Sequence, residues 1–246
     1  ITMEMAEERI AERIDANLLN LTMDELKVVD KDIYESRIEK ITKKTQGKLI
    51  VKEYPTAGAH SGHFRALLEE LKLKREFKPD IIFIDYLNIC ASQRMKQGAN
   101  VNSYTYVKAI AEELRGLAVE YNVPIVSATQ TTRSGYTNSD PGLEDTSESF
   151  GLPATADFMF ALVSNEELEA LNHIIVKQLK NRYNDPSFYK RFVVGIDRAK
   201  MKLYDVEASA QVGLSDSGQD DDTPVFDKSD FGKRAKAEGS FDGWKF

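Results

Sequence analysis

Three polar side chains stand directly after short apolar segments of the sequence. Glu4 follows Ile-Thr-Met, Asp85 follows Ile-Ile-Phe-Ile, and Gln130 follows Ser-Ala-Thr. One carboxylate can polarise an attacking water, a second can hold Mg²⁺ through its water molecules, and an amide can sense the γ-phosphate of a nucleotide. Ligands of open α/β sheets bind beyond the carboxyl ends of the strands. The pattern therefore predicts a nucleotide site, with Asp85 in the role of the Walker-B acid.

Each of these residues also has a purely structural interpretation. Asp85 can cap the turn that follows its strand, and Gln130 can be an ordinary amide at a strand end. Glu4 can be an acid at the N-terminus of a helix, where the helix dipole favours negative charge. Spacing alone leaves both interpretations open.

The elements that must position these side chains form an α/β pattern. The apolar run that ends at Asp85 is rich in β-branched residues and is typical of a strand buried on both faces of a parallel sheet. Alternating strands and helices predict a mostly parallel sheet flanked by helices, with three final strands as an antiparallel edge. The predicted helices span residues 5–20, 32–44, 61–74, 103–122 and 165–171, and the predicted strands 49–54, 80–85, 123–130, 157–163, 173–179, 189–196 and 201–206.

Composition limits the class of protein further. The net charge of −7 over 246 residues argues against general coating of nucleic acid, although a locally basic pore remains compatible with it. Cys90 is the only cysteine, so the chain cannot form an intrachain disulfide, and a reducing cytosol is expected. No apolar run approaches the roughly 18 residues of a membrane span, and no signal peptide is recognisable.

Two polar loops and a tail complete the organisation. The loops at 91–102 and 131–149 follow the strands that bear Asp85 and Gln130, so they leave the same edge of the sheet. From Glu207 onward Ser, Gly and Asp dominate, which predicts a disordered acidic tail over 207–246 after a domain at 1–206. The aromatic residues at the end of that tail either dock a partner or remain in a free tail.

Several motifs agree in order and spacing with a known family. They are Ile-Thr-Met-Glu-Met, Ile-Ile-Phe-Ile-Asp-Tyr-Leu, Val-Pro-Ile-Val-Ser-Ala-Thr-Gln and Glu-Ser-Phe-Gly-Leu-Pro-Ala-Thr-Ala-Asp. With them, residues 1–206 resemble the DnaB-like replicative DNA helicases, particularly those of T4-like phages. The resemblance implies a RecA-like ATPase domain that forms a hexameric ring around single-stranded DNA. Such a ring uses ATP and Mg²⁺ to unwind duplex DNA by 5′–3′ translocation, with a primase and a helicase loader as partners.

The resemblance also implies roles for individual residues. Glu4 matches the catalytic glutamate, Asp85 the Walker-B aspartate that holds Mg²⁺, and Gln130 the phosphate-sensing glutamine. Lys180 and Arg182 match a basic pair on a hairpin that reaches the neighbouring subunit's ATP site, with Arg182 as the arginine finger. The structural alternative is that Lys180 and Arg182 are merely solvent-exposed residues at the tip of a hairpin.

The two polar loops correspond to the loops that line the pore of the ring in this family. Their cations Arg94, Lys96 and Arg133 are candidates for contacts with DNA phosphates. Acidic residues also occur in the second loop. Backbone N–H groups are therefore an alternative to side chains as donors to the DNA phosphates.

The sequence departs from the family pattern in one respect. The phosphate-binding P-loop, Gly-x4-Gly-Lys-Ser/Thr, has no match in these residues. In the family it precedes the Ile-Thr-Met-Glu segment, so we expect it upstream of Ile1, together with the domain that recruits primase, and we expect the chain alone not to turn over ATP. Two other interpretations remain open: a RecA-like DNA-dependent ATPase or recombinase, and a non-catalytic DNA-binding module without a P-loop.

Overall fold

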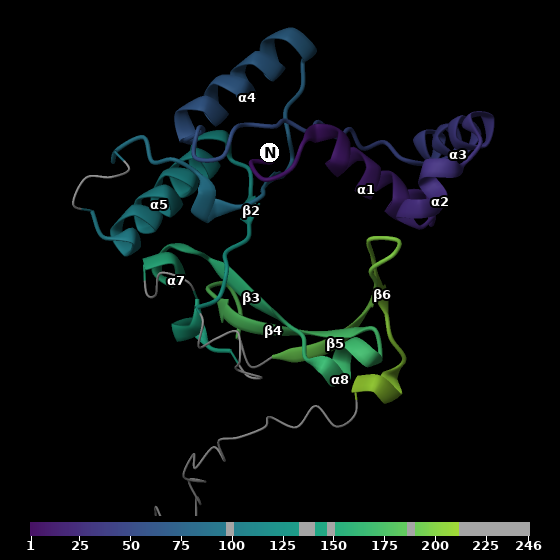
Figure 1. Ribbon diagram of the computed structural model, residues 1–246. Coiled ribbons are helices and arrows are strands. Elements are labelled where there is room, and N and C mark those ends of the chain that lie inside the picture. Colours follow the sequence, from purple (N-terminus) through teal and green to yellow (C-terminus); the bar gives the residue numbers. More distant parts are fainter. Residues whose placement is uncertain (97–100, 133–140, 147–150, 186–189, 212–246) are drawn as a thin grey trace, which may run out of the picture. The chain divides into compact units, whose positions relative to one another are not determined.

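A pair of short parallel strands lies at the centre of the α/β part of the chain (Figure 1). The structure is a computed structural model and describes residues 1–96, 101–132, 141–146, 151–185 and 190–211. Strand β1 (Ile82–Ile84) pairs with β2 (Ile125–Ser127), with Phe83 opposite Val126. Thr2 forms parallel bridges both to Asp85, directly after β1, and to Glu53. The extended N-terminal segment therefore runs beside β1.

Helices α4 (Ser61–Arg75) and α5 (Ser103–Tyr121) share a core with this parallel pair. Ile82 and Ile84 are buried in that core, whereas Phe83 between them is 56% exposed, as the alternation of side chains along a strand requires. The prediction that this strand is buried on both faces is therefore wrong for the described residues, because Phe83 points away from α4 and α5. The core contains Met3, Phe64, Leu68, Ile82, Ile84, Val107, Ile110, Leu114 and Leu117.

Phe64 gives a direct test of this core. Its side chain is fully buried and its ring meets that of Tyr54 edge-on, with centroids 5.7 Å apart. Phe64→Ala is expected to cost about 3–5 kcal/mol, because truncation loses the transfer free energy and leaves a cavity. For a chain of this size that lowers the midpoint of thermal unfolding by about 10 °C. Leu73→Ala on the same helix is the control, since Leu73 is 77% exposed, and a similar shift for both variants would contradict the assignment of the core.

The N-terminal part of the chain after the Thr2 segment is helical. Helix α1 (Glu7–Leu19) and α3 (Lys31–Lys44) lie where the apolar stripes predict them. Between them, where no helix is predicted from the sequence, the structure has a further short helix, α2 (Met23–Val28). The reason is a capping box: the Thr22 hydroxyl accepts from the Glu25 N–H, and the Glu25 carboxylate accepts from the Thr22 N–H.

The predicted strand over 49–54 is reduced to its last residues. Thr2 N–H donates to Lys52 O, and Tyr54 N–H donates to Thr2 O, both at 2.9 Å. These bonds make a single bridge at Glu53. Within the described part of the chain, the backbone of this segment bridges to Thr2 alone, which explains why an apolar segment of strand-like composition forms a bridge instead of a ladder.

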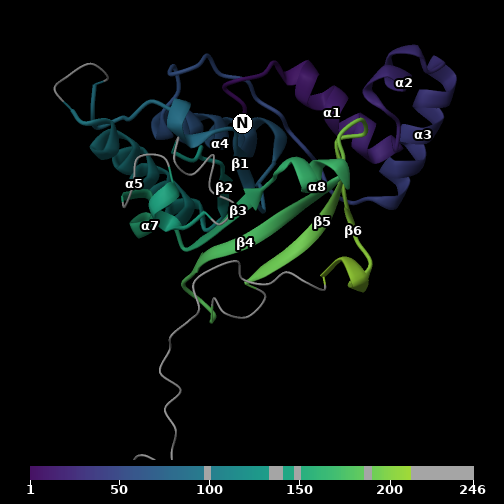
Figure 2. The same cartoon turned by 60° about the horizontal axis from the view of Figure 1, so that its bottom comes forward.

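The C-terminal strands form an antiparallel sheet. The strands are β3 (Phe158–Val163), β4 (His173–Asn181), β5 (Arg191–Asp197) and β6 (Lys202–Asp205), in the order β3-β4-β5-β6. Figure 2 shows them side by side. Helix α7 (Gly151–Thr155) precedes β3 and contacts α5, and α8 (Glu166–Ala170) joins β3 to β4. The predicted fold class is thereby confirmed, and among the described residues the antiparallel strands form a hydrogen-bonded sheet of their own.

The structured part of the chain extends past residue 206. A single 3-10 turn, η3 (Ala208–Gln211), follows β6. The Gln211 amide accepts from Val193 N–H and donates to Val193 O, both at 2.8 Å, so this turn is tied to β5. The rest of the predicted tail, 212–246, lies outside the described residues. None of the described helices combines the length and apolar character that crossing a membrane requires.

Candidate functional site

The structure brings Glu4, Asp85 and Gln130 to the carboxyl edge of the parallel strands. Asp85 N–H donates to Ile1 O and Met3 N–H donates to Asp85 O, each at 3.0 Å, so Glu4 leaves the sheet beside Asp85. On the other side of β1, the Gln130 amide donates to the Tyr86 hydroxyl at 3.3 Å. All three side chains are exposed, as residues that meet a ligand must be.

The backbone around Glu4 is fixed although its side chain is exposed. Thr2 Oγ1 donates to Met5 O at 2.9 Å and accepts from Met5 N–H at 3.2 Å, which closes a turn around Glu4. Thr56 Oγ1 donates to Met3 O at 2.7 Å. Helix α1 begins only at Glu7, after the N-cap residue Ala6. Glu4 therefore precedes the helix, which weakens the interpretation that it is a helix N-terminal acid.

Side-chain hydrogen bonds join the segments that follow β1 and β2. Ser127 Oγ donates to Ile84 O, and Thr129 Oγ1 donates to Asn88 Oδ1, both at 2.8 Å. The 3-10 turn after β1, η1 (Leu87–Ile89), has Tyr86 as its N-cap residue and no side-chain cap. Asp85 is thus not the cap of that turn, so the structural alternative for Asp85 finds no support in the geometry.

The donors at this edge suit a hard cation. Carboxylate and amide oxygens are the ligands that Mg²⁺ accepts, usually together with several waters and substrate phosphates. Asp85 and Glu4 supply such oxygens, and Gln130 adds an amide. The backbone cradle for phosphates that the P-loop provides is not encoded in these residues, so the chain supplies only part of a nucleotide site.

Lys180 and Arg182 lie against the end of α7 instead of projecting from a hairpin tip. Arg182 donates to Asp157 Oδ1 at 2.9 Å and to Ala154 O at 3.1 Å, and the Lys180 ammonium donates to Pro153 O. The last carbonyl groups of a helix attract cations because they carry its negative end. This placement corrects the expectation of a freely projecting basic pair.

A second arginine shares the carboxylate that holds Arg182. Arg115 from α5 donates to Asp157 Oδ1 at 2.7 Å and to Thr155 O at 2.8 Å. The hydrogen bond from Arg115 lowers the pKa of Asp157, and Arg182 lowers it further. Burial lowers the pKa of Lys180, with a further contribution from Arg182. We call Arg115, Asp157, Lys180 and Arg182 the α7 cluster.

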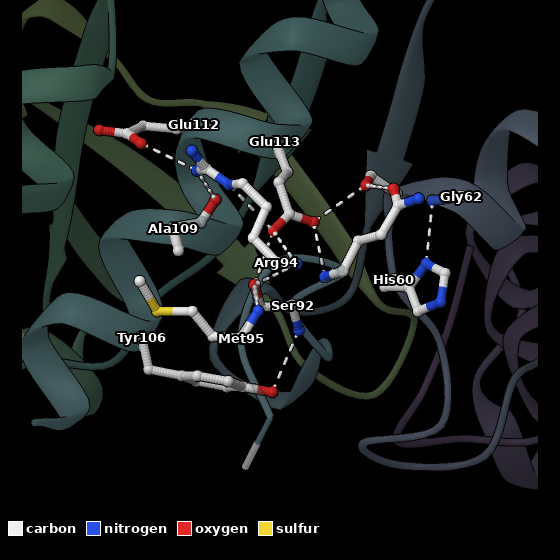
Figure 3. Close-up of polar contacts among 11 residues, drawn as sticks. His60, Gly62, Ser92, Arg94, Met95, Tyr106, Ala109, Glu112 and Glu113 are labelled. Atoms are coloured by element: carbon white, nitrogen blue, oxygen red, sulfur yellow. Dashed lines mark hydrogen bonds and ion pairs between the residues drawn. The ribbon is translucent and has the colours of Figure 1, made fainter. Parts of the chain in front are cut away.

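The first polar loop begins inside the fold. Cys90 and Ser92 are 2% and 7% exposed, so the chain is still buried where the predicted polar loop at 91–102 begins. The Arg94 guanidinium donates to Glu112 at 2.8 Å, to Ala109 O at 2.9 Å and to Glu113 at 3.4 Å (Figure 3). These partners hold Arg94 against α5, so its prediction as a phosphate-binding cation is not favoured by this geometry.

The remaining DNA-contact candidates differ in what the structure describes. Lys96 is exposed on the same loop, and Arg133 lies outside the described residues. Sequence reasoning missed Asp157 and Glu113 as organising groups. Asp157 closes the Glu-Ser-Phe-Gly-Leu-Pro-Ala-Thr-Ala-Asp motif, which was an available signal, whereas Glu113 stands in a helix among other charged residues and has no local signal.

The described fold matches solved structures of one class. A solved ATPase domain superimposes with a TM-score of 0.67 at 19% identity, over 84% of this chain and 73% of that one. A DnaB-like replicative helicase solved for its interactions with primase gives a TM-score of 0.66 at 18% identity, over 84% of this chain and 49% of that one. The chain therefore has the predicted RecA-like fold.

Sequence relatives give the family within that class. The model of the DnaB-like helicase C terminal domain matches residues 1–186, and the chain belongs to this family. It is 47% identical over 210 residues to the DnaB-like replicative helicase of Enterobacteria phage T4, covering 84% of this chain and 44% of that protein. It is 30% identical over 193 residues to a probable plasmid replicative DNA helicase of Chlamydia psittaci, covering 74% of this chain and 40% of that protein. The chain thus spans less than half the length of these relatives.

Proposed function

We propose that the chain is the motor domain of an ATP-dependent replicative DNA helicase that acts as a hexameric ring on single-stranded DNA. The observation that carries the proposal is the meeting of Glu4, Asp85 and Gln130 at one edge of the parallel strands. Family membership adds the expectation of 5′–3′ translocation. The active protein also needs a phosphate-binding loop that these residues do not encode.

The side chains at the sheet edge have distinct tasks in this proposal. Bound Mg²⁺-ATP supplies the phosphoryl group that is transferred. Glu4 orients the attacking water and takes up its proton, because a carboxylate positioned at hydrogen-bond reach acts as a general base. Asp85 would hold Mg²⁺, which would neutralise charge on the phosphate oxygens. Gln130 senses whether the γ-phosphate is present and passes this to the chain segment that follows β2.

The α7 cluster serves the neighbouring subunit in this proposal. The guanidinium of Arg182 stabilises charge on the transferring phosphoryl group across the interface, with Lys180 beside it. Asp157 and the carbonyl of Ala154 hold Arg182 while 44% of its side chain remains exposed. An arginine held in this way reaches a neighbour from a defined position.

DNA and protein partners follow from the same assignment. The loops at 91–102 and 131–149 contact the DNA backbone, with Lys96 and Arg133 as the candidate cations and Arg94 in a supporting position. Primase and a helicase loader are the proposed protein partners, and the primase is supported by a related helicase solved with attention to that interaction. The protein would act on DNA in the cytoplasm.

The test is an assay of the complete protein on a forked duplex. We expect single-stranded DNA to stimulate ATP hydrolysis, and we expect strand displacement only when the loading strand has a free 5′ arm. ATP hydrolysis without strand displacement would favour a RecA-like DNA-dependent ATPase or recombinase. DNA binding without any binding of ATP would favour a non-catalytic module.

A further inference from the structure

A buried carboxylate on α5 holds the chain segment that leaves β1 (Figure 3). Only 8% of the Glu113 side chain is exposed. Its oxygens accept hydrogen bonds from Ser92 Oγ at 2.6 Å and from Ser61 Oγ at 2.9 Å. They also accept from the backbone N–H groups of Gln93 at 2.9 Å and Arg94 at 3.3 Å. Glu113 therefore ties both the start of α4 and the base of the 91–102 loop to α5.

Other residues of α5 fix the same segment. Ser92 N–H donates to the Tyr106 hydroxyl at 3.0 Å, and the Arg94 guanidinium donates to Ala109 O and Glu112. Tyr106, Ala109 and Glu112 are spaced by three residues, so they lie along one side of the helix. The base of the loop is consequently held along two turns of α5.

The charge on Glu113 is compensated by hydrogen bonds. Burial raises the pKa of Glu113, but the bonds from Ser92, Gln93, Ser61 and Arg94 outweigh that effect and lower it. The group is therefore ionised at neutral pH. A carboxylate in this state needs donors around it, and the Ser92 hydroxyl and the Gln93 N–H group would lose this acceptor if the carboxylate were removed.

The segment held by Glu113 is continuous with the nucleotide edge. It runs from Asp85 through η1 to Cys90, which is 2% exposed. Ala91 N–H then donates to Ala59 O at 2.7 Å, which fastens the segment to the chain before α4. The stretch between Asp85 and the loop thus has little freedom to move independently of either end.

We propose that Glu113 is a positioning residue that couples DNA binding by the 91–102 loop to the nucleotide edge at Asp85. This inference rests on the proposed function, because it requires the loop to contact DNA and the edge to hold ATP. Glu113 touches neither ligand. It fixes the base of the loop, so that a force or displacement at the loop is passed to the segment that ends at Asp85.

The test is Glu113→Gln in the complete protein. Gln93 N–H bonds to Oε2 of Glu113 and Arg94 N–H bonds to Oε1. Glutamine keeps the shape and one acceptor oxygen, but the amino group that replaces the other oxygen cannot accept from the N–H group on its side. Stimulation of ATP turnover by single-stranded DNA is expected to fall about tenfold, within the range measured for residues that couple two sites. Turnover without DNA should stay within about twofold, and hydrogen exchange should accelerate at the one of these two amides that faces the amino group.

Two further variants keep the test decisive. Ser92→Ala removes one donor to Glu113, together with the acceptor of the Arg94 and Met95 N–H groups, and is expected to weaken stimulation in the same direction. Glu120→Gln is the matched control, since it breaks the ion pair with Arg65 (2.7 Å) between α4 and α5 without touching residues 92–95, and stimulation should be unchanged.

Two outcomes would overturn the inference. Wild-type stimulation in both Glu113→Gln and Ser92→Ala, despite faster exchange, would make the network merely structural. An equal fall in turnover with and without DNA would show that Glu113 does not act through the loop. If the unmodified complete protein shows no stimulation by DNA, the proposed function itself fails, and this is a different result from failure in the variants alone.

Discussion

Arg182→Ala in the complete, assembled protein is expected to reduce ATP turnover about a thousandfold while leaving the affinity for ATP largely intact. The reason is that an arginine finger stabilises charge that develops only as the phosphoryl group is transferred, an effect worth about 10³–10⁵ in rate. Ground-state binding depends mainly on other groups, so the loss should appear in turnover and not in binding. Steady-state hydrolysis and equilibrium binding of a fluorescent ATP analogue measure the two quantities separately.

Mixing of subunits shows whether Arg182 acts on a neighbour. Rings made from Arg182→Ala and Glu4→Gln subunits contain interfaces that have both an intact Glu4 and an intact Arg182 from the adjacent subunit. Such rings should regain turnover if Arg182 acts across the interface, whereas action within one subunit predicts no recovery. Arg198→Ala is the control, because Arg198 is a similarly exposed arginine that pairs with Glu169 at 3.6 Å. Wild-type turnover in Arg182→Ala would remove this residue from the site.

The position of Arg182 is determined by residues outside its own hairpin. The sequence indicated a basic pair at an exposed turn, and Arg182 is indeed exposed. Its position is nevertheless set by Asp157, 25 residues away, and by the end of α7. Arg115 occupies the same oxygen of Asp157, so Arg182 is oriented by a residue that no local pattern connects to it.

The fold was predictable where apolar residues recur at one regular spacing along the sequence. The stripe through Val107, Ile110, Leu114 and Leu117 placed a helix at 103–122, and α5 spans Ser103–Tyr121. The three final strands were also predicted as antiparallel, and β4 ends two residues beyond its predicted boundary. The structure adds β3 to them as a fourth antiparallel strand. Such segments are reliable because burial of one face selects both the type of element and its register.

The predicted secondary structure was wrong where it depends on a particular hydrogen-bonding partner. Helix α2 exists because Thr22 and Glu25 cap each other, a short-range signal that the hydrophobic pattern does not contain. The segment at 49–54 has the composition of a strand, yet among the described residues its β-bridge is a single one, to Thr2. Strand propensity describes how well a residue fits a sheet and does not determine whether a neighbouring strand is available.

The candidate site was predictable only in part. That Glu4, Asp85 and Gln130 lie at one edge of the sheet was expected, since the carboxyl ends of parallel strands share one edge. The partners of Arg94 could not be predicted, because Glu112 and Glu113 belong to a helix separated from it by a loop. A cation in a polar loop is interpreted as a ligand-binding residue until the carboxylates that face it are known.

Glu4→Gln in the complete protein is expected to slow ATP hydrolysis by about 10²–10⁴-fold, which is the contribution of a positioned general base. ATP should still bind, because Asp85 and the phosphate-binding loop are untouched and the glutamine fits the same space. The turn between Thr2 and Met5 holds the backbone of residue 4 in place, so the substitution should change the chemistry without disturbing the fold.

Glu8→Gln is the control, since Glu8 is an exposed acid in the first turn of α1. Single-turnover hydrolysis with prebound ATP isolates the chemical step from nucleotide exchange. Equal rates for Glu4→Gln and the unmodified protein would make Glu4 a surface acid near α1, and the water-activating group would have to be sought elsewhere on the sheet edge.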